Sequence, residues 1–169
     1  MNYNTVSKDL RDCFDDWKRF YILLDEDIES KTKDGLLISE KELFYRWQCR
    51  LLDLSNVGNY VLFEQTENNV VVGMLAYSIV KRIGYETYKP SYYIYICDFY
   101  VLPEYRSIGI GKRLLEYIKN KSHEFEIDEI FVGTVAENDR AVRFYTNNSF
   151  GLTGYNFKWS KTPELLQGE

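Results

Sequence analysis

Apolar residues recur at helical spacing in two segments near the start of the chain. The first segment begins near Ser7, a residue type that often caps helix N-termini. Its apolar positions then follow every three or four residues, all on one face: Leu10, Phe14, Trp17, Tyr21 and Leu24. A capping box of Ser39 and Glu42 predicts the start of a second amphipathic helix. The apolar positions of this helix are Leu43, Trp47, Leu51 and Leu54.

The middle of the chain is rich in β-branched and aromatic residues, which favour strands. Residues 60–65 and 70–81 are strand-like, and residues 67–69, Glu-Asn-Asn, predict a hairpin turn between them. Residues 92–101 form another strand-like run. We therefore expect at least one antiparallel hairpin, followed by a further strand.

The last third of the chain alternates between helical and strand patterns. It predicts a helix over about 109–121, a strand over 129–135, a helix over 139–147 and a final strand over about 152–160. The strand–helix–strand unit from 92 to 135 requires a parallel, right-handed crossover, whereas the hairpin is antiparallel. The expected fold class is therefore mixed α/β (α+β mixed), with helices on both faces of one sheet.

Length and composition fit one globular domain over residues 1–169, with a frayed tail after about 162. The chain has 169 residues, of which 45% are hydrophobic and 28% charged. The formal net charge is −5, so the chain lacks the basic surface expected of a nucleic-acid-binding protein or of one attracted to anionic membranes. We expect neither nucleic acid nor a membrane among its partners.

The cysteines and the histidine argue against a disulfide framework and a metal site. Cys13, Cys49 and Cys97 are widely spaced, and the polar start of the sequence lacks an apolar signal segment. These features predict a cytoplasmic protein with reduced thiols. One histidine, His123, and scattered cysteines leave no expected zinc site, and the same arrangement gives no Cys–His pair for covalent catalysis.

A glycine-containing turn between a predicted strand and a predicted helix carries the first chemical signal. It reads Arg-Ser-Ile-Gly-Ile-Gly-Lys over residues 106–112. Unpaired amides at a helix N-terminus suit a phosphate, and glycine lets that backbone approach the anion. A Walker A loop does not fit, because Arg113 follows Gly111-Lys112, and Leu114 occupies the third glycine of the dinucleotide fingerprint. By itself, the turn also fits an ordinary loop.

A second motif follows the next predicted strand. Its members fit the pattern N-x-x-A-x-x-F-Y, closed by a phenylalanine: Asn138, Ala141, Phe144, Tyr145 and Phe150. With both motifs, residues 92–150 resemble the GNAT superfamily of N-acetyltransferases, which use acetyl-CoA. Residues 94–111 are also similar to the diamine (spermidine/spermine) N-acetyltransferases. The resemblance implies a GNAT fold, with a mixed, mostly antiparallel sheet of six to seven strands flanked by about four helices.

The resemblance also assigns roles in binding acetyl-CoA and in catalysis. It implies that backbone groups of Phe99, Tyr100 and Val101 pair with the pantetheine arm, and that a strand bulge aims an N–H at the thioester oxygen. The turn that would hold the pyrophosphate comprises Arg106, Ser107, Ile108, Gly109, Ile110, Gly111 and Lys112. Asn138 matches a cofactor-contacting position. Tyr145 matches the tyrosine that protonates the leaving thiolate, although it also fits a core position.

Two departures from the family pattern change the expectations. Cys97 stands where many relatives carry a glutamate that serves as a base. Asp98, Glu64 or a chain of water molecules could take its place, although Asp98 points to the opposite face of a regular strand. Ser149 stands where a glycine is usual, so the left-handed turn is assigned to residues 147–148, Asn-Asn, and Ser107 is a milder change of the same kind.

Acidic and aromatic residues offer hypotheses about the acceptor. The group at 25–29 lies where the family builds its acceptor site, and it fits a polyamine-binding edge or, as favoured here, a solvated helix end. The tyrosines of the run 92–100 fit a pocket for a cationic or aromatic amine, or an ordinary aromatic sheet surface.

The expected function is that of an acetyl-CoA-dependent N-acetyltransferase. It would transfer the acetyl group directly to a primary amine of a small molecule. A protein or peptide acceptor is one alternative, and a non-catalytic acyl-CoA-binding module is another, which Cys97 keeps open. By analogy with the family, a paired or swapped final strand would allow a homodimer.

Overall fold

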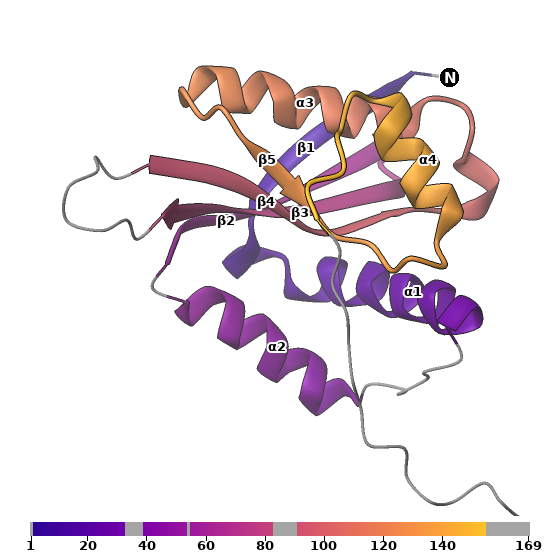
Figure 1. Cartoon of the computed structure of the whole chain (residues 1–169). Helices are drawn as coiled ribbons and strands as arrows, with labels where there is room; N and C mark the ends of the chain where they lie inside the picture. The colour runs from indigo at the N-terminus through magenta and orange to yellow at the C-terminus, as the bar shows by residue number, and fades with distance from the viewer. Residues whose placement is uncertain (1, 33–38, 54, 83–90, 155–169) are drawn as a thin grey trace, which may run out of the picture.

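The computed structural model describes residues 2–32, 39–53, 55–82 and 91–154 (Figure 1). Its elements follow in the order β1 (Tyr3–Asp9), η1 (Leu10–Asp12), α1 (Phe14–Thr32), α2 (Glu40–Leu52), β2 (Asn56–Thr66), β3 (Val71–Arg82), β4 (Ser91–Val101), η2 (Pro103–Tyr105), α3 (Ile110–Glu124), β5 (Ile130–Val132) and α4 (Asp139–Asn147). The strands form one sheet in the order β1-β2-β3-β4-β5.

The first element is a strand, so the prediction of a helix starting near Ser7 is wrong. Residues 3–9 pair with β2 along their whole length, and Ser7 lies opposite Leu62. The Asp9 side chain then caps a short 3-10 turn, and the first helix starts at Phe14. The helical spacing was correct from Phe14 onward, but tertiary pairing with β2 determines the conformation before it.

The second helix begins as predicted. Ser39 and Glu42 form both hydrogen bonds of the capping box at the start of α2. Leu43 is fully buried, and Trp47 and Leu51 pack against the core from the same helix. Local capping and the apolar face therefore determine this element together.

Strand pairing follows the predicted topology. β2 and β3 form the antiparallel hairpin around residues 67–69, and β3 also pairs antiparallel with β4. The chain then crosses through α3 to β5, which pairs parallel with β4. The described residues contain five strands, however, and not six to seven. Of the predicted final strand, 152–154 are not in a strand and 155–160 lie outside the described residues.

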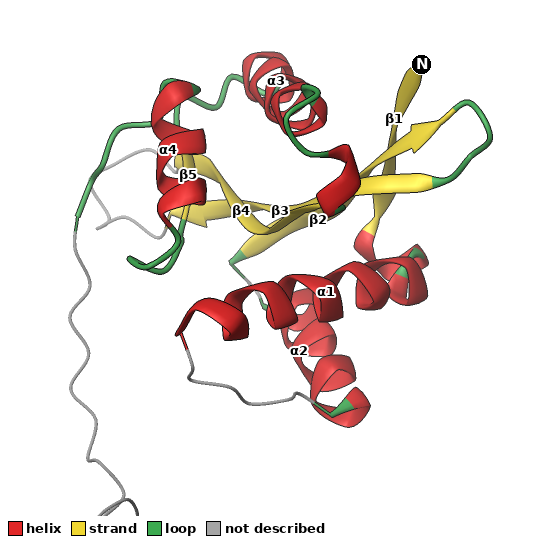
Figure 2. Ribbon diagram, turned by 90° about the vertical axis from the view of Figure 1, so that its right-hand side faces the viewer, coloured by secondary structure: helices red, strands yellow, loops and turns green. Residues whose placement is uncertain are grey.

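Helices cover both faces of the sheet, as Figure 2 shows. α1 and α2 lie on one face, and their side contains a core built around Trp17, Phe20 and Phe63. α3 lies on the opposite face with α4 beside it, above a core that includes Leu75 and Leu114. Within the described ranges, no helix is long and apolar enough to cross a membrane.

Candidate active site

The sheet is open along the second half of β4. β5 pairs with β4 at three positions, the last being Ile96 opposite Val132. β4 itself continues to Val101. In the part of the chain that the structure describes, no strand pairs with this edge of β4 beyond Ile96, so backbone groups there can bind an extended ligand.

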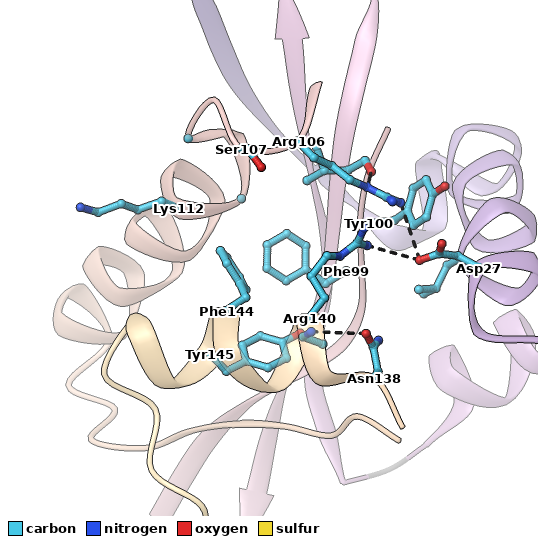
Figure 3. Close-up of a pocket in the computed structure, with 15 residues that line it drawn as sticks. Asp27, Phe99, Tyr100, Arg106, Ser107, Lys112, Asn138, Arg140, Phe144 and Tyr145 are labelled. Carbon is cyan, nitrogen blue, oxygen red and sulfur yellow. Dashed lines mark hydrogen bonds and ion pairs between the residues drawn. The ribbon is translucent and has the colours of Figure 1, made fainter. Parts of the chain in front are cut away.

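A cavity of about 350 Å³, here called the edge cavity, lies at this open edge (Figure 3). Its walls come from α1, β4, the turn before α3, the first turn of α3, and α4. The lining residues are Leu24, Asp27, Phe99, Tyr100, Val101, Arg106, Ser107, Gly109, Gly111, Lys112, Asn138, Arg140, Ala141, Phe144 and Tyr145. Most residues that the sequence assigned to acetyl-CoA and to catalysis therefore meet in one place.

Two residues of the predicted turn do not line this cavity. The Ile110 side chain is buried in the core beneath α3, with 1% of its surface exposed, whereas Ile108 is 57% exposed. Only their backbone groups can serve the predicted role, because both side chains lie elsewhere.

The N-terminus of α3 provides the anion-binding geometry that the turn predicted. Gly109 precedes the helix with a φ of 95°, a left-handed conformation that glycine adopts without steric cost. The first intrahelical hydrogen bond runs from the Arg113 amide to the Gly109 carbonyl, so the amides of 110–112 have no acceptor within the helix. No acidic residue lies in the first turn, and this end of the helix favours negative charge.

Gly111 allows α3 and α4 to approach each other closely. A Cβ atom at this position would lie 3.0 Å from Cζ of Phe144 and 3.5 Å from Cζ of Phe99. The Phe144 and Phe99 rings meet edge to face, with centroids 5.5 Å apart. Glycine at 111 therefore keeps the wall formed by α4 in place.

Arg106 lines the cavity, but its guanidinium does not lie at the helix N-terminus. Its Nε donates to the Val101 carbonyl at 2.8 Å, and its Cζ lies 5.1 Å from the centroid of the Tyr100 ring. Nη2 lies 3.6 Å from an Asp27 oxygen, and it is buried without a hydrogen-bond partner. The Val101 carbonyl, predicted to meet the pantetheine arm, already accepts from Arg106.

Asp27 connects α1 with both arginines of the cavity, and the sequence argument missed this role. The carboxylate that binds Arg106 also lies 3.4 Å from Nη2 of Arg140, at the start of α4 (Figure 3). The favoured interpretation of the acidic group as a solvated helix end is therefore wrong for Asp27, whose side chain is 24% exposed. Arg140 occupies a position of the second motif at which the pattern allows any residue. Its positive charge was the signal that could have identified it as a residue of the site.

Asn138 and Tyr145 are placed by α4. The Asn138 side chain caps the helix by accepting from the Ala141 amide at 3.3 Å, which leaves its NH₂ group as a donor. The Tyr145 ring packs against Phe99, Phe144 and Phe150 at centroid distances of 6.4, 5.5 and 5.7 Å. Burial raises the pKa of Tyr145 well above its ordinary value, so the phenol keeps its proton.

A bulge in β4 places Cys97 and Asp98 on the same side of the sheet. Ile96 lies opposite Tyr77 and Asp98 opposite Ala76, so Cys97 has no partner in the register. The bulge that the resemblance implied is therefore present. Burial raises the pKa of the Cys97 thiol, although Arg50 acts in the opposite direction, so this group is not a ready base.

Both carboxylates considered as replacement bases are already bound. Asp98 accepts from Nη1 of Arg50 at 2.6 Å and from the Trp17 indole at 2.9 Å. Glu64 is fully buried and accepts from Arg113 at 2.6 Å and from Thr5 at 2.5 Å. Glu64 is not among the residues that line the edge cavity, and its carboxylate is already engaged by Arg113.

A second cavity of about 450 Å³, here called the α2 cavity, lies between α2 and the sheet. It is lined by Cys49, Arg50, Asp53, Ser55, Asn56, Ser78, Val80, Tyr93, Tyr95 and Cys97. In the part of the chain that the structure describes, no three His, Cys, Asp or Glu side chains gather as a metal site.

The two serines at glycine positions both adopt left-handed backbone. Ser107 has a φ of 63° and Ser149 a φ of 68°. Asn148 has a φ of −109°, so the assignment of the second turn to residues 147–148 is wrong. Ser149 itself makes the turn that leads the chain out of α4.

Comparison with known proteins agrees with this geometry. The acetyltransferase (GNAT) family model matches residues 10–151. A mutant of the BH1408 protein from Bacillus halodurans has a similar fold, with a TM-score of 0.76, 19% identity, and coverage of 94% of this chain and 99% of that chain. No curated protein matches the sequence.

Two aminoglycoside-related structures are also similar in fold. AAC(6')-Iy, in complex with the bisubstrate analog CoA-S-monomethyl-acetylneamine, has a TM-score of 0.66 at 13% identity, covering 95% of this chain and 99% of that chain. The aminoglycoside antibiotic 6'-N-acetyltransferase AAC(6')-Ih from Acinetobacter baumannii has a TM-score of 0.65 at 20% identity, and the match covers 96% of this chain and 99% of that chain.

Proposed function

Because the chain belongs to the GNAT acetyltransferase family, a family of acyltransferases that use acetyl-CoA, we propose that it transfers acetyl to a primary amine of a small molecule. The observation that carries this proposal is the edge cavity. It joins a free helix N-terminus, the open edge of β4 and the Tyr145 phenol in one space of about 350 Å³. These three features fit an anionic, extended thioester.

The residues of the edge cavity fit acetyl-CoA, which supplies an activated acetyl group when bound. The amides of 110–112 would hold its pyrophosphate at the N-terminus of α3. Arg140 would add a second cationic contact, and Lys112 would provide charge at the rim. The buried Nη2 of Arg106 has a donor to spare, which supports an anionic or carbonyl oxygen nearby.

The polar groups along β4 would orient the pantetheine arm. Backbone groups of Phe99 and Tyr100 lie on the edge that no described strand covers. The Cys97 bulge would direct a backbone N–H out of the sheet, where it could polarise the thioester carbonyl. Asn138 would bind the arm through its free NH₂ group.

Tyr145 would hold the proton that the departing sulfur receives. Its phenol stays neutral because burial raises its pKa, so Oη is a donor at physiological pH. The acceptor ammonium must also lose a proton before attack. With Asp98 and Glu64 both bound to arginines, we assign this step to water.

Two solved structures with a similar fold support a small-molecule acceptor. AAC(6')-Iy was solved with an analog that joins CoA to acetylneamine, and AAC(6')-Ih is an aminoglycoside 6'-N-acetyltransferase. The local likeness to diamine acetyltransferases over residues 94–111 favours a different amine, but one that is also small and multiply charged.

Calorimetry with acetyl-CoA, followed by an assay of CoA release, tests the proposal. The acceptor panel comprises polyamines, amino sugars, amino acids and peptides. We expect acetyl-CoA to bind and small amines to release CoA. No binding at millimolar acetyl-CoA would overturn the proposal. Turnover with peptides alone would show that the acceptor is a protein or peptide. Binding of acetyl-CoA without any turnover would identify an acyl-CoA-binding module.

A further inference from the structure

We propose that the α2 cavity binds the acceptor, and that Asp53 recognises a second ammonium group of that acceptor, remote from the nitrogen that is acetylated. This inference rests on the proposed function, because it needs the edge cavity to present the acetyl group. It identifies the substrate class as small molecules with at least two amino groups.

The linings of the two cavities come within two residues of each other along β4. Cys97 lines the α2 cavity, and Phe99, two residues further along, lines the edge cavity. β5 ends at Val132, opposite Ile96, so in the described part of the chain no strand closes the sheet between the two cavities. An amine at the Cys97 end of the α2 cavity would therefore lie beside the open edge.

Asp53 lies at the opposite end of the α2 cavity. The cavity follows β4 from Cys97 back to Tyr93, which is four residues, or about 13 Å at roughly 3.3 Å per residue. Tyr93 lies opposite Val80, and Val80 lies opposite Asn56. The Asn56 amide donates to the Asp53 carbonyl at 3.0 Å, which fixes Asp53 at this end. A short amine could not occupy both ends.

The charges that line the α2 cavity favour a cation at this remote end. Arg50 also lines the cavity, but its charge is balanced by Asp98, which it contacts at 2.6 Å. Hydrogen bonds from the Ser55 hydroxyl and amide lower the pKa of Asp53, so its carboxylate is ionised at neutral pH. Tyr95, which is 41% exposed, adds an aromatic surface that attracts cations.

A further charged pair near this end does not cancel the charge of Asp53. Arg82 lies 5.4 Å from the centroid of the Tyr93 ring, and it forms an ion pair with Glu129 at 2.5 Å. Because this pair is neutral as a whole, the α2 cavity retains one net negative charge from Asp53. An acceptor carboxylate would be repelled there, and a second ammonium would be attracted.

A series of α,ω-diamines of increasing length, each compared with the monoamine of equal length, tests the inference. In the wild type, KM should fall when the chain becomes long enough to reach Asp53. In Asp53→Asn, KM for the long diamines should rise about fivefold, while kcat, KM for monoamines and the Kd for acetyl-CoA stay unchanged. Asparagine keeps the oxygen that accepts from Ser55, so the local turn is preserved.

The matched control is Glu67→Gln, which removes an exposed carboxylate from the β2–β3 turn. Its KM for long diamines should equal that of the wild type. A linear polyamine and a two-ring amino sugar represent the two sources of a second ammonium. The compound whose KM rises in Asp53→Asn is the source that uses the site. Equal KM values for diamines and monoamines, or an unchanged KM in Asp53→Asn, would overturn the inference.

Calorimetry with a long diamine in the absence of acetyl-CoA separates this inference from the proposed function. Binding that Asp53→Asn weakens would support the site even if no acetyl transfer occurs. Failure to bind acetyl-CoA, together with diamine binding that depends on Asp53, would overturn the proposed function and leave a diamine site at the α2 cavity. Diamine binding that does not depend on Asp53 would overturn the inference while leaving acetyl transfer intact.

Discussion

The two cavities along β4 have opposite electrostatic character. The edge cavity is lined by three cationic side chains, Arg106, Lys112 and Arg140, and by one carboxylate, Asp27. In the α2 cavity, Arg50 is neutralised by Asp98 and the charge of Asp53 remains. A net charge of −5 for the whole chain therefore describes neither. The difference indicates that one strand separates a site suited to an anion from one suited to a cation, and variants can test each side separately.

The largest expected effect concerns the chemical step between the two cavities. Tyr145→Phe removes the phenolic proton and keeps the ring that packs against Phe150. We expect kcat to fall about 100-fold with an unchanged Kd for acetyl-CoA, measured by CoA release and calorimetry. Because burial raises the pKa of Tyr145 above its ordinary 10.0, ionisation of this phenol should not reduce the wild-type kcat below pH 10. Wild-type turnover in Tyr145→Phe would exclude the proton-donor role.

The next prediction concerns anion binding in the edge cavity. In Gly111→Ala the new methyl group would lie 3.0 Å from the Phe144 ring and displace the α4 wall. Overpacking of this kind costs about 1–3 kcal/mol of folding stability. Because the same methyl group moves the wall of the edge cavity, we also expect roughly tenfold weaker acetyl-CoA binding by calorimetry. Gly151→Ala is the control, because no described atom lies within 4 Å of the place its methyl group would take. Equal affinities in the two variants would contradict the role of Gly111.

A smaller effect sharpens the electrostatic contrast. Asp27→Asn removes the carboxylate that lines the edge cavity and releases Arg140 and Arg106. We expect CoA to bind about threefold more tightly at low ionic strength, with the gain shrinking as salt is added. Asp15→Asn, which removes a 93% exposed charge from the same helix, is the control. Weaker CoA binding in Asp27→Asn would mean that the carboxylate mainly orients the arginines.

The smallest effect concerns the end of the α4 wall. Ser149→Gly removes the steric strain of a left-handed backbone, which costs roughly 1–2 kcal/mol. Against this gain stands the additional conformational entropy that glycine loses on folding, roughly 0.5–1 kcal/mol. We expect a net gain of about 0–1.5 kcal/mol, centred on roughly 0.75 kcal/mol, in the free energy of unfolding, measured by urea denaturation. Asn148→Gly, at a φ of −109°, should destabilise the protein instead. A gain in Asn148→Gly would contradict the assignment of the turn.

Local signals predicted most of the elements. The capping box at Ser39 and the hairpin turn at 67–69 depend on neighbouring residues, and both are confirmed. The α4 pattern was also correct to the residue. The segment 3–9 was mistaken for helix because its conformation depends on pairing with β2, more than fifty residues later. Strand pairing over that separation leaves little trace in local periodicity.

The site shows the same division between local and distant contacts. Motifs placed Gly109, Asn138 and Tyr145 together correctly, because a strand and a helix bring their motifs to one edge. The contact between Asp27 and Arg140 joins residues 113 positions apart, and no motif contains both. The pairing of Asp98 with Arg50 was likewise invisible, since it depends on how α2 packs on the sheet.

The extra residue in β4 has a consequence for insertions and deletions. Side chains of a strand alternate between faces, and Cys97 shifts that alternation by one position. Shortening the strand by this residue would exchange the faces of everything on one side of it. Either Asp98 would leave Arg50 and Phe99 would leave Phe144, or Ile94 and Ile96 would leave the core beneath α3. Chain length in this stretch is thus constrained separately from residue identity, because a substitution at Cys97 keeps the alternation of side chains whereas its deletion does not.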